Sequence, residues 1–189
     1  MRKQLISTFL IFSILALSLP IEASSHKKYR HQKNYRKHKV EEAVAIIQPT
    51  RGNSVKGVVI FRQKKEGVKV TGRFTGLTPN QKHGIHIHQY GDISSPDGKS
   101  AGGHYNPKGH PHGHPPTLKR HAGSFGNIQA DKKGRGSIDL FDKTISISRH
   151  HHPILGRTVV IHAKEDTGEQ PAGNAGSRIG IGVIGIKKP

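Results

Sequence analysis

The sequence predicts an all-β protein, either an antiparallel β-sandwich or a Greek-key β-barrel, with about eight strands. Short β-rich runs follow one another from Glu41 onward, and turn residues at 78–81, 95–99 and 131–136 separate them. No segment shows a convincing helical period. The 189 residues include 23 Gly and 11 Pro but only 5% aromatic residues, which is typical of one domain with many turns and a single core.

Each expected strand is a short run rich in β-branched residues, bounded by Gly, Pro, Asn or Asp. In chain order the expected strands are residues 42–48, 55–63, 67–74, 82–89, 126–130, 136–142, 144–147, 157–163 and 181–186. Between them, residues 91–123 have little strand pattern but contain five histidines. A loop of that length is usually functional, and a bound metal could order it.

The N-terminus has the features of an export signal. Arg2 and Lys3 precede an apolar run at 5–19, and small residues follow near Ala23. We therefore expect residues 1–23 to be a signal peptide and the protein to be secreted or periplasmic. The alternative is an uncleaved anchor, but a bilayer span needs about 20 apolar residues and this run is shorter.

A basic segment follows at 24–40, before the expected domain at 41–189. Residues 26–39 contain seven Lys or Arg, three His and no acidic residue. High charge and low hydrophobicity predict a disordered arm. Three interpretations stay open: attachment to an anionic envelope surface, metal capture by the histidines, and a solvated tail without a ligand. Export argues against nucleic acid as the partner, although the net charge is +19.

Histidines in four separate segments have the spacing that a shared metal site requires. His86 and His88 are two residues apart in an expected strand, so both side chains point to one face. Further histidines lie in the motifs at 101–107, 120–123 and 160–164. Neutral imidazole suits copper and zinc, so these histidines predict copper or zinc chemistry rather than a calcium or magnesium site.

These motifs, together with GNAGSRIGIGVIGI at 173–186, resemble the copper/zinc superoxide dismutases over about residues 42–187. The resemblance implies a Greek-key barrel with long metal-binding loops, copper and zinc as cofactors, and superoxide as the substrate. It implies copper ligands at His86, His88, His104 and His162, and zinc ligands at His104, His112 and His121.

Other roles are implied by the same resemblance. His104 would bridge the two metals and take part in catalysis, Arg178 would lie over the copper channel, and Asp166 would link the two metal sites. The motifs at 156–158 and 182–186 are similar to the eukaryotic branch, in which these segments form the dimer contact. A homodimer is therefore a further expectation.

The chain departs from the family pattern in three places. Ser124 stands where the family has its zinc-binding aspartate, so we expect weak zinc binding, with water, His110 or His114 completing the ligand set. The chain has no Cys, and Gly98 and Ile181 occupy the positions of the family's disulfide. The segment between His162 and Arg178 is also shorter than the family's electrostatic loop. The other interpretation is that His110 and His114 are exposed and bind no metal.

Two functions are compatible with this sequence. A superoxide dismutase is favoured by the complete set of copper-type histidines together with Arg178. A non-catalytic copper or zinc binding or delivery protein is the alternative, favoured by the lost aspartate, the lost disulfide and the spare histidines. We expect no ligand role for His83, and the histidines of the surface turn at 150–152 could bind metal only adventitiously.

Overall fold

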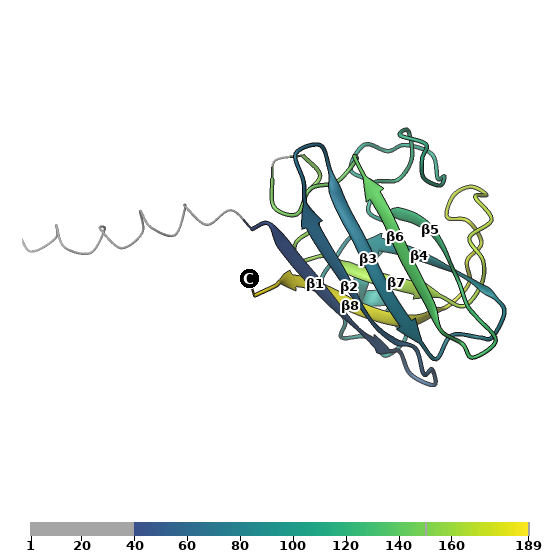
Figure 1. The fold of residues 1–189 in the computed structure, drawn as a ribbon. Helices are drawn as coiled ribbons and strands as arrows, with labels where there is room; N and C mark the ends of the chain where they lie inside the picture. Colours follow the sequence, from purple (N-terminus) through teal and green to yellow (C-terminus); the bar gives the residue numbers. More distant parts are fainter. Residues whose placement is uncertain (1–39, 150, 189) are drawn as a thin grey trace, which may run out of the picture. The chain divides into compact units, whose positions relative to one another are not determined.

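The structure is a computed structural model, and it describes residues 40–149 and 151–188. Its regular elements are eight β-strands and a short 3-10 helix, η2 (Figure 1). The strands are β1 Glu42–Pro49, β2 Lys56–Gln63, β3 Val68–Thr75, β4 Lys82–His88, β5 Ser124–Gln129, β6 Gly136–Asp142, β7 Thr158–His162 and β8 Arg178–Ile186, and η2 is Lys99–Ala101. The expected signal peptide and residues 24–39 of the basic arm lie outside the described residues.

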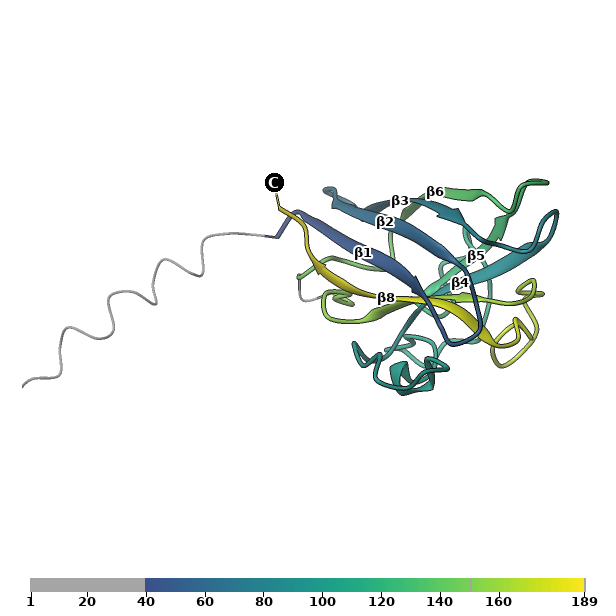
Figure 2. The same ribbon diagram turned by 90° about the horizontal axis from the view of Figure 1, so that it is seen from below.

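The strands form an antiparallel barrel with Greek-key connections, as the sequence predicts. Their order is β5-β4-β7-β8-β1-β2-β3-β6, so the chain crosses from one end of the order to the other between β3 and β4. Strands β1, β2, β3 and β6 form one layer and β4, β5 and β7 the other, and β8 pairs with both layers (Figure 2). β5 and β6, at the two ends of this order, lie side by side but do not pair, so the barrel is nearly but not fully closed.

The core lies between the two layers and follows the alternation of the strands. In β1 the residues Ala43, Ala45 and Ile47 are buried, while the residues between them are at least partly exposed. Strands β4 and β7 differ, because nearly every residue in them is buried. The segments 89–123 and 163–177 contact the face of β4 that points away from the core. Side chains on that face are therefore shielded from water by the loops.

One predicted strand is wrong. Residues 144–147 form no strand and take part in a single isolated bridge, between Ser146 and Pro153. Ile145 and Ile147 do reach the core, which explains the apolar alternation. However, the Ile147 N–H donates to the Gln63 side chain, and the Ser146 hydroxyl donates to the carbonyl of His151. The hydrogen bonds of this segment thus go to side chains and to its own turn, rather than to a neighbouring strand.

The positions of the missing disulfide lie together in the fold. A Cβ atom placed on Gly98 would be 3.1 Å from Cδ1 of Ile181, whose side chain packs with Ala101 and Val160. The Arg178 guanidinium also donates to the carbonyl of Gly98. An apolar contact and a charge-assisted hydrogen bond therefore connect this loop to the barrel.

Among the described residues, no helix is long and apolar enough to cross a membrane.

Candidate metal centre

Four histidines from three parts of the chain meet on the outer face of β4. His86 and His88 come from β4, His162 ends β7, and His104 follows the loop after η2. One nitrogen from each lies within 4.8 Å of those of the other three. Pairing of β4 with β7, and a bridge between His88 and His104, position these segments. The structure thus brings together all four residues of the expected copper set.

Hydrogen bonds fix the protonation of two of these rings. Nδ1 of His88 lies 2.8 Å from the Gly102 carbonyl, and Nδ1 of His162 lies 3.1 Å from the Gly176 carbonyl. A carbonyl only accepts, so each Nδ1 must carry the proton and donate it. In the neutral rings each Nε2 then carries a lone pair, and the two Nε2 atoms are 3.3 Å apart. Two lone pairs that face each other repel, and a cation bound by both nitrogens would remove this repulsion.

His86 presents its lone pair from the opposite nitrogen. Its Nε2 donates to Oδ2 of Asp166 over 2.7 Å, which leaves Nδ1 buried with no hydrogen-bond partner. An orphaned buried acceptor is costly unless something binds it. Burial lowers the pKa of His86 and His88, and it lowers the pKa of His162 to about 3. Near neutral pH these rings are neutral, which is the form that binds metal, so the residues fit a copper ion.

A second group of nitrogens lies on the other side of His104. Nδ1 of His104 is 3.3 Å from Nδ1 of His121, and Nδ1 of His112 is 3.5 Å from the same atom. The Ser124 hydroxyl oxygen lies 3.2 Å from Nδ1 of His112. Three imidazoles and one oxygen fit the number of ligands that zinc takes, although a hydroxyl is a weaker donor than a carboxylate. Because His104 uses Nδ1 here, its Nε2 remains for the copper-type group.

Asp166 connects the two histidine groups. Its carboxylate accepts hydrogen bonds from Nε2 of His86 and from Nε2 of His112 over 2.7 and 2.8 Å, and also from the Gly168 N–H. The Asn127 side chain bonds both the N–H and the carbonyl of Asp166. Burial raises the pKa of Asp166, but hydrogen bonds from His112 and His86 outweigh it and hold the pKa below its usual value. The carboxylate stays ionised and orients one ring of each group.

Arg178 lies beside the copper-type group, at the start of β8. Its Nη2 donates over 2.6 Å to the Gly102 carbonyl, the same oxygen that accepts from Nδ1 of His88. Its positive charge lowers the pKa of His88 and of His162 further, although burial is the larger cause. Burial also lowers the pKa of Arg178, but an arginine in a protein remains charged. The site therefore holds a fixed positive charge near the histidines.

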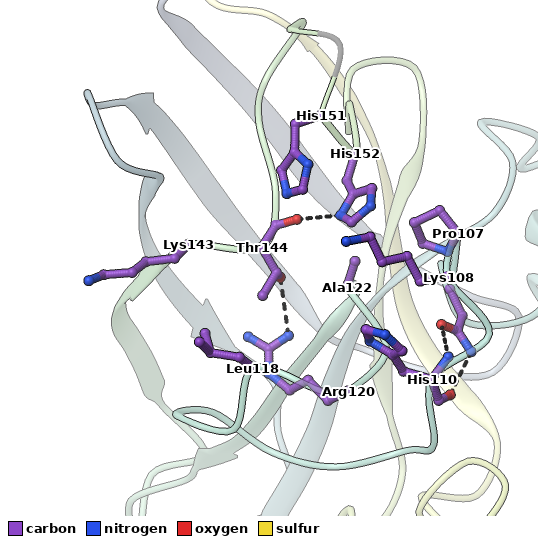
Figure 3. A pocket seen from close by; sticks show the side chains of 11 residues that line it. Pro107, Lys108, His110, Leu118, Arg120, Ala122, Lys143, Thr144, His151 and His152 are labelled. Carbon is purple, nitrogen blue, oxygen red and sulfur yellow. Dashed lines mark hydrogen bonds between the residues drawn. The ribbon is translucent and has the colours of Figure 1, made fainter.

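The spare histidines lie elsewhere. His110 lines a cavity of about 220 Å³ with Arg120, His151 and His152, and it does not belong to the zinc-type group of nitrogens (Figure 3). His114 contacts Asp166 rather than the nitrogens of the zinc-type group.

Sequence reasoning missed what His83 does. This residue is fully buried, accepts from the Thr78 N–H through Nε2, and donates from Nδ1 to the His162 carbonyl over 2.9 Å. It has no place in either histidine group. The alternation of β4 contained the signal, because His83 is an odd number of residues from His86 and so faces the core. His83 therefore fixes the backbone of His162 from beneath.

Comparisons with known proteins agree with this geometry. The family model of copper/zinc superoxide dismutase matches residues 55–184. The chain is 40% identical to a "Superoxide dismutase [Cu-Zn]" of Paramecium bursaria Chlorella virus 1 over 77% of this chain and 79% of the relative. It is 43% identical to a "Superoxide dismutase [Cu-Zn] 2" of Mesembryanthemum crystallinum, over 78% of this chain and 97% of the relative.

Two further matches concern location and fold. An "Extracellular superoxide dismutase [Cu-Zn]" of Brugia pahangi is 37% identical over 78% of this chain and 77% of the relative. The solved structure titled "Crystal Structure Analysis of the clock protein EA4" superimposes with a TM-score of 0.71 at 39% identity, covering 79% of this chain and 98% of that one.

Proposed function

Since the chain belongs to the copper/zinc superoxide dismutase family, we propose that it dismutes superoxide at a copper ion held by His86, His88, His104 and His162. The activity itself and the two metals follow from the family and from the relatives at 37–43% identity. The proposal adds the ligands and the role of each residue. The observation that carries it is the convergence of four imidazole nitrogens within 4.8 Å of one another, among them the buried Nδ1 of His86, which has no hydrogen-bond partner.

The chemistry divides between the metal and the chain. Bound copper supplies one-electron transfer, taking an electron from one superoxide to give dioxygen and passing it to a second, which with two protons gives hydrogen peroxide. His104 would hold a proton at Nε2, the nitrogen facing the copper-type group, and deliver it to the product. Asp166 would keep His86 in the tautomer that presents Nδ1. A zinc ion at His104, His112 and His121 would fix the other side of His104.

A delivery protein would hold copper through the same ligands, so binding alone does not separate the two functions. The separating experiment measures copper content and dismutase rate on the same purified sample, and then the rate of copper loss to a chelator. A dismutase retains its copper during turnover and, with a chelator present to silence free copper, exceeds the rate of an equal amount of copper added without protein. A delivery protein surrenders copper readily and shows no excess rate.

We propose that Arg178 attracts superoxide, and we expect Arg178→Glu to slow turnover by at least about tenfold at low ionic strength. Clefts with focused positive charge raise the on-rates of anions by about 10 to 10³, and the substitution reverses that charge. Copper content should not change, since Arg178 bonds two backbone carbonyls and no ligand nitrogen. The rate should be measured across a salt series.

Arg178→Gln is the matched control, because the amide can still donate to a carbonyl but carries no charge. Its rate should fall between those of the parent and the Glu variant. A Glu variant as fast as the parent at low salt would rule out guidance by this residue, and a loss of copper would show a structural role instead.

We further propose that the protein is exported and that residues 26–39 bind anionic surfaces. An extracellular relative supports export, and the concentration of basic residues supports the surface. Each Lys or Arg near an anionic membrane contributes about 1 kcal/mol, and salt screens this attraction. Deletion of 26–39 from the chain without residues 1–23 should abolish the salt-sensitive retention on phosphatidylserine vesicles and leave dismutation unchanged. Equal retention of both forms would support the solvated-tail interpretation.

We propose a homodimer as well, through the segments 156–158 and 182–186. Ile186, in the second of these segments, is 66% exposed. A second copy of the chain would remove such surface from water.

A further inference from the structure

His114 lies against the carboxylate that joins the two histidine groups. Its Nε2 is 2.9 Å from Oδ1 of Asp166, and this nitrogen is buried but makes no well-aligned hydrogen bond. The rest of the side chain is 35% exposed. A Cβ atom placed on Gly168 would lie 3.7 Å from Cε1 of His114, so the ring also packs beside the loop that carries Asp166. The ring of His114 also packs edge-on against that of His112, with the two ring centroids 6.0 Å apart.

We propose that His114 is a positioning residue that holds Asp166, and through it His86, when the zinc-type group is empty. The inference rests on the proposed function, because it concerns the copper site. A carboxylate only accepts, so His114 must offer Nε2–H, and a small rotation of the ring would align this bond. The contact brings a third imidazole to a carboxylate that already accepts from His86 and His112.

The need for such a residue follows from Ser124. A metal bound to His112 through Nδ1 would fix that ring, and the ring would fix Asp166 in turn. With a hydroxyl in place of a carboxylate, the zinc-type group binds its metal less strongly and is more often empty. Nδ1 of His112 would then have the Ser124 hydroxyl as its neighbour, 3.2 Å away. The ring of His112, and with it one support of Asp166, would then be held by hydrogen bonds and packing alone, without a metal bond.

His114 supplies support that does not depend on zinc. It belongs to neither histidine group, and its Nε2 contacts Asp166 directly. It lies two residues from His112, so it connects the same loop to the same carboxylate. Partners that orient a metal ligand typically change metal affinity by about 10- to 100-fold when they are removed. We therefore expect the effect of losing His114 to appear in the copper site of zinc-free protein.

The test compares the parent with His114→Leu, which removes the donor, and with His114→Gln, which keeps an N–H donor. His151→Leu is the matched control, since this histidine lies in the separate cavity. Each protein is prepared metal-free, given one equivalent of copper with or without saturating zinc, and examined by electron paramagnetic resonance and by chelator competition. Without zinc, His114→Leu should bind copper about tenfold more weakly with an altered spectrum. His114→Gln and His151→Leu should match the parent.

With zinc bound, all four proteins should give the same copper affinity and spectrum, because the metal then fixes His112. This dependence on zinc distinguishes a positioning role from general damage to the fold. The proposal is overturned if His114→Leu matches the parent without zinc, or if it is equally impaired with zinc. A parent that binds no copper would instead defeat the proposed function, and the inference with it.

Discussion

His88→Ala is expected to leave the fold intact and to lower both copper affinity and dismutase activity by at least about 100-fold. Removing a residue that merely orients a ligand costs about 10- to 100-fold in affinity, so removing a ligand should cost no less. His88 is 1% exposed, and its Nε2 faces that of His162 at 3.3 Å. Alanine removes one of the converging lone pairs and also the hydrogen bond to Gly102.

The measurement is copper content by mass spectrometry together with the dismutase rate per chain. His151→Ala serves as the control, because it removes an imidazole outside both histidine groups. Circular dichroism of the metal-free proteins checks that the barrel is retained. An alanine variant at His88 that turns over as fast as the parent would show that the reaction takes place elsewhere.

Ser124→Asp is expected to strengthen zinc binding and to raise the melting temperature of the zinc-loaded protein. The Ser124 hydroxyl oxygen is already 3.2 Å from Nδ1 of His112, so a carboxylate would enter beside the three nitrogens as a charged ligand. A tenfold gain in affinity corresponds to about 1.4 kcal/mol when zinc is in excess. For a domain of this size, where 1 kcal/mol shifts the melting temperature by about 2 to 4 °C, that free energy raises it by about 3 to 6 °C.

The effect of Ser124→Asp on the melting temperature should reverse when metal is removed. Ser124 is fully buried, and a carboxylate there without zinc would be an uncompensated buried charge, so the metal-free variant should melt below the parent. Ser124→Asn, similar in shape but neutral, should show neither effect. Zinc competition measures the affinity, and calorimetry with and without zinc measures the rise and the fall of the melting temperature. If the parent binds zinc as tightly as Ser124→Asp does, another group completes the ligand set and our interpretation of Ser124 is wrong.

Much of the fold was predictable because burial in strands leaves a period-two pattern. The eight observed strands all have a predicted counterpart, although β5 and β8 begin earlier than expected, at Ser124 and Arg178. Both extensions contain Gly, Ser or Arg, which carry little strand signal. The ninth expected strand failed because apolar alternation reports burial, whereas a strand also needs a partner for its backbone, and Ile147 finds one in a side chain.

The site was predictable in part, for a different reason. Spacing within β4 places His86 and His88 on one face, but only the family motifs joined them to His104 and His162. The contact of His114 with Asp166 could not be read from the sequence, since the two residues come from separate irregular loops. Irregular loops have no period from which side-chain directions follow. For the same reason the sequence left open whether His110 or His114 completes the zinc-type group.

The central claim is that one copper ion, held by the four-histidine group, performs the dismutation. Stepwise addition of copper to the metal-free protein, with the dismutase rate followed by pulse radiolysis after each addition, tests it most directly. We predict that the rate rises in proportion to copper and stops rising at one copper per chain, because the described residues contain a single group of four histidines. Copper that binds at one per chain while the rate, measured with a chelator present to silence free copper, stays at background would contradict the claim.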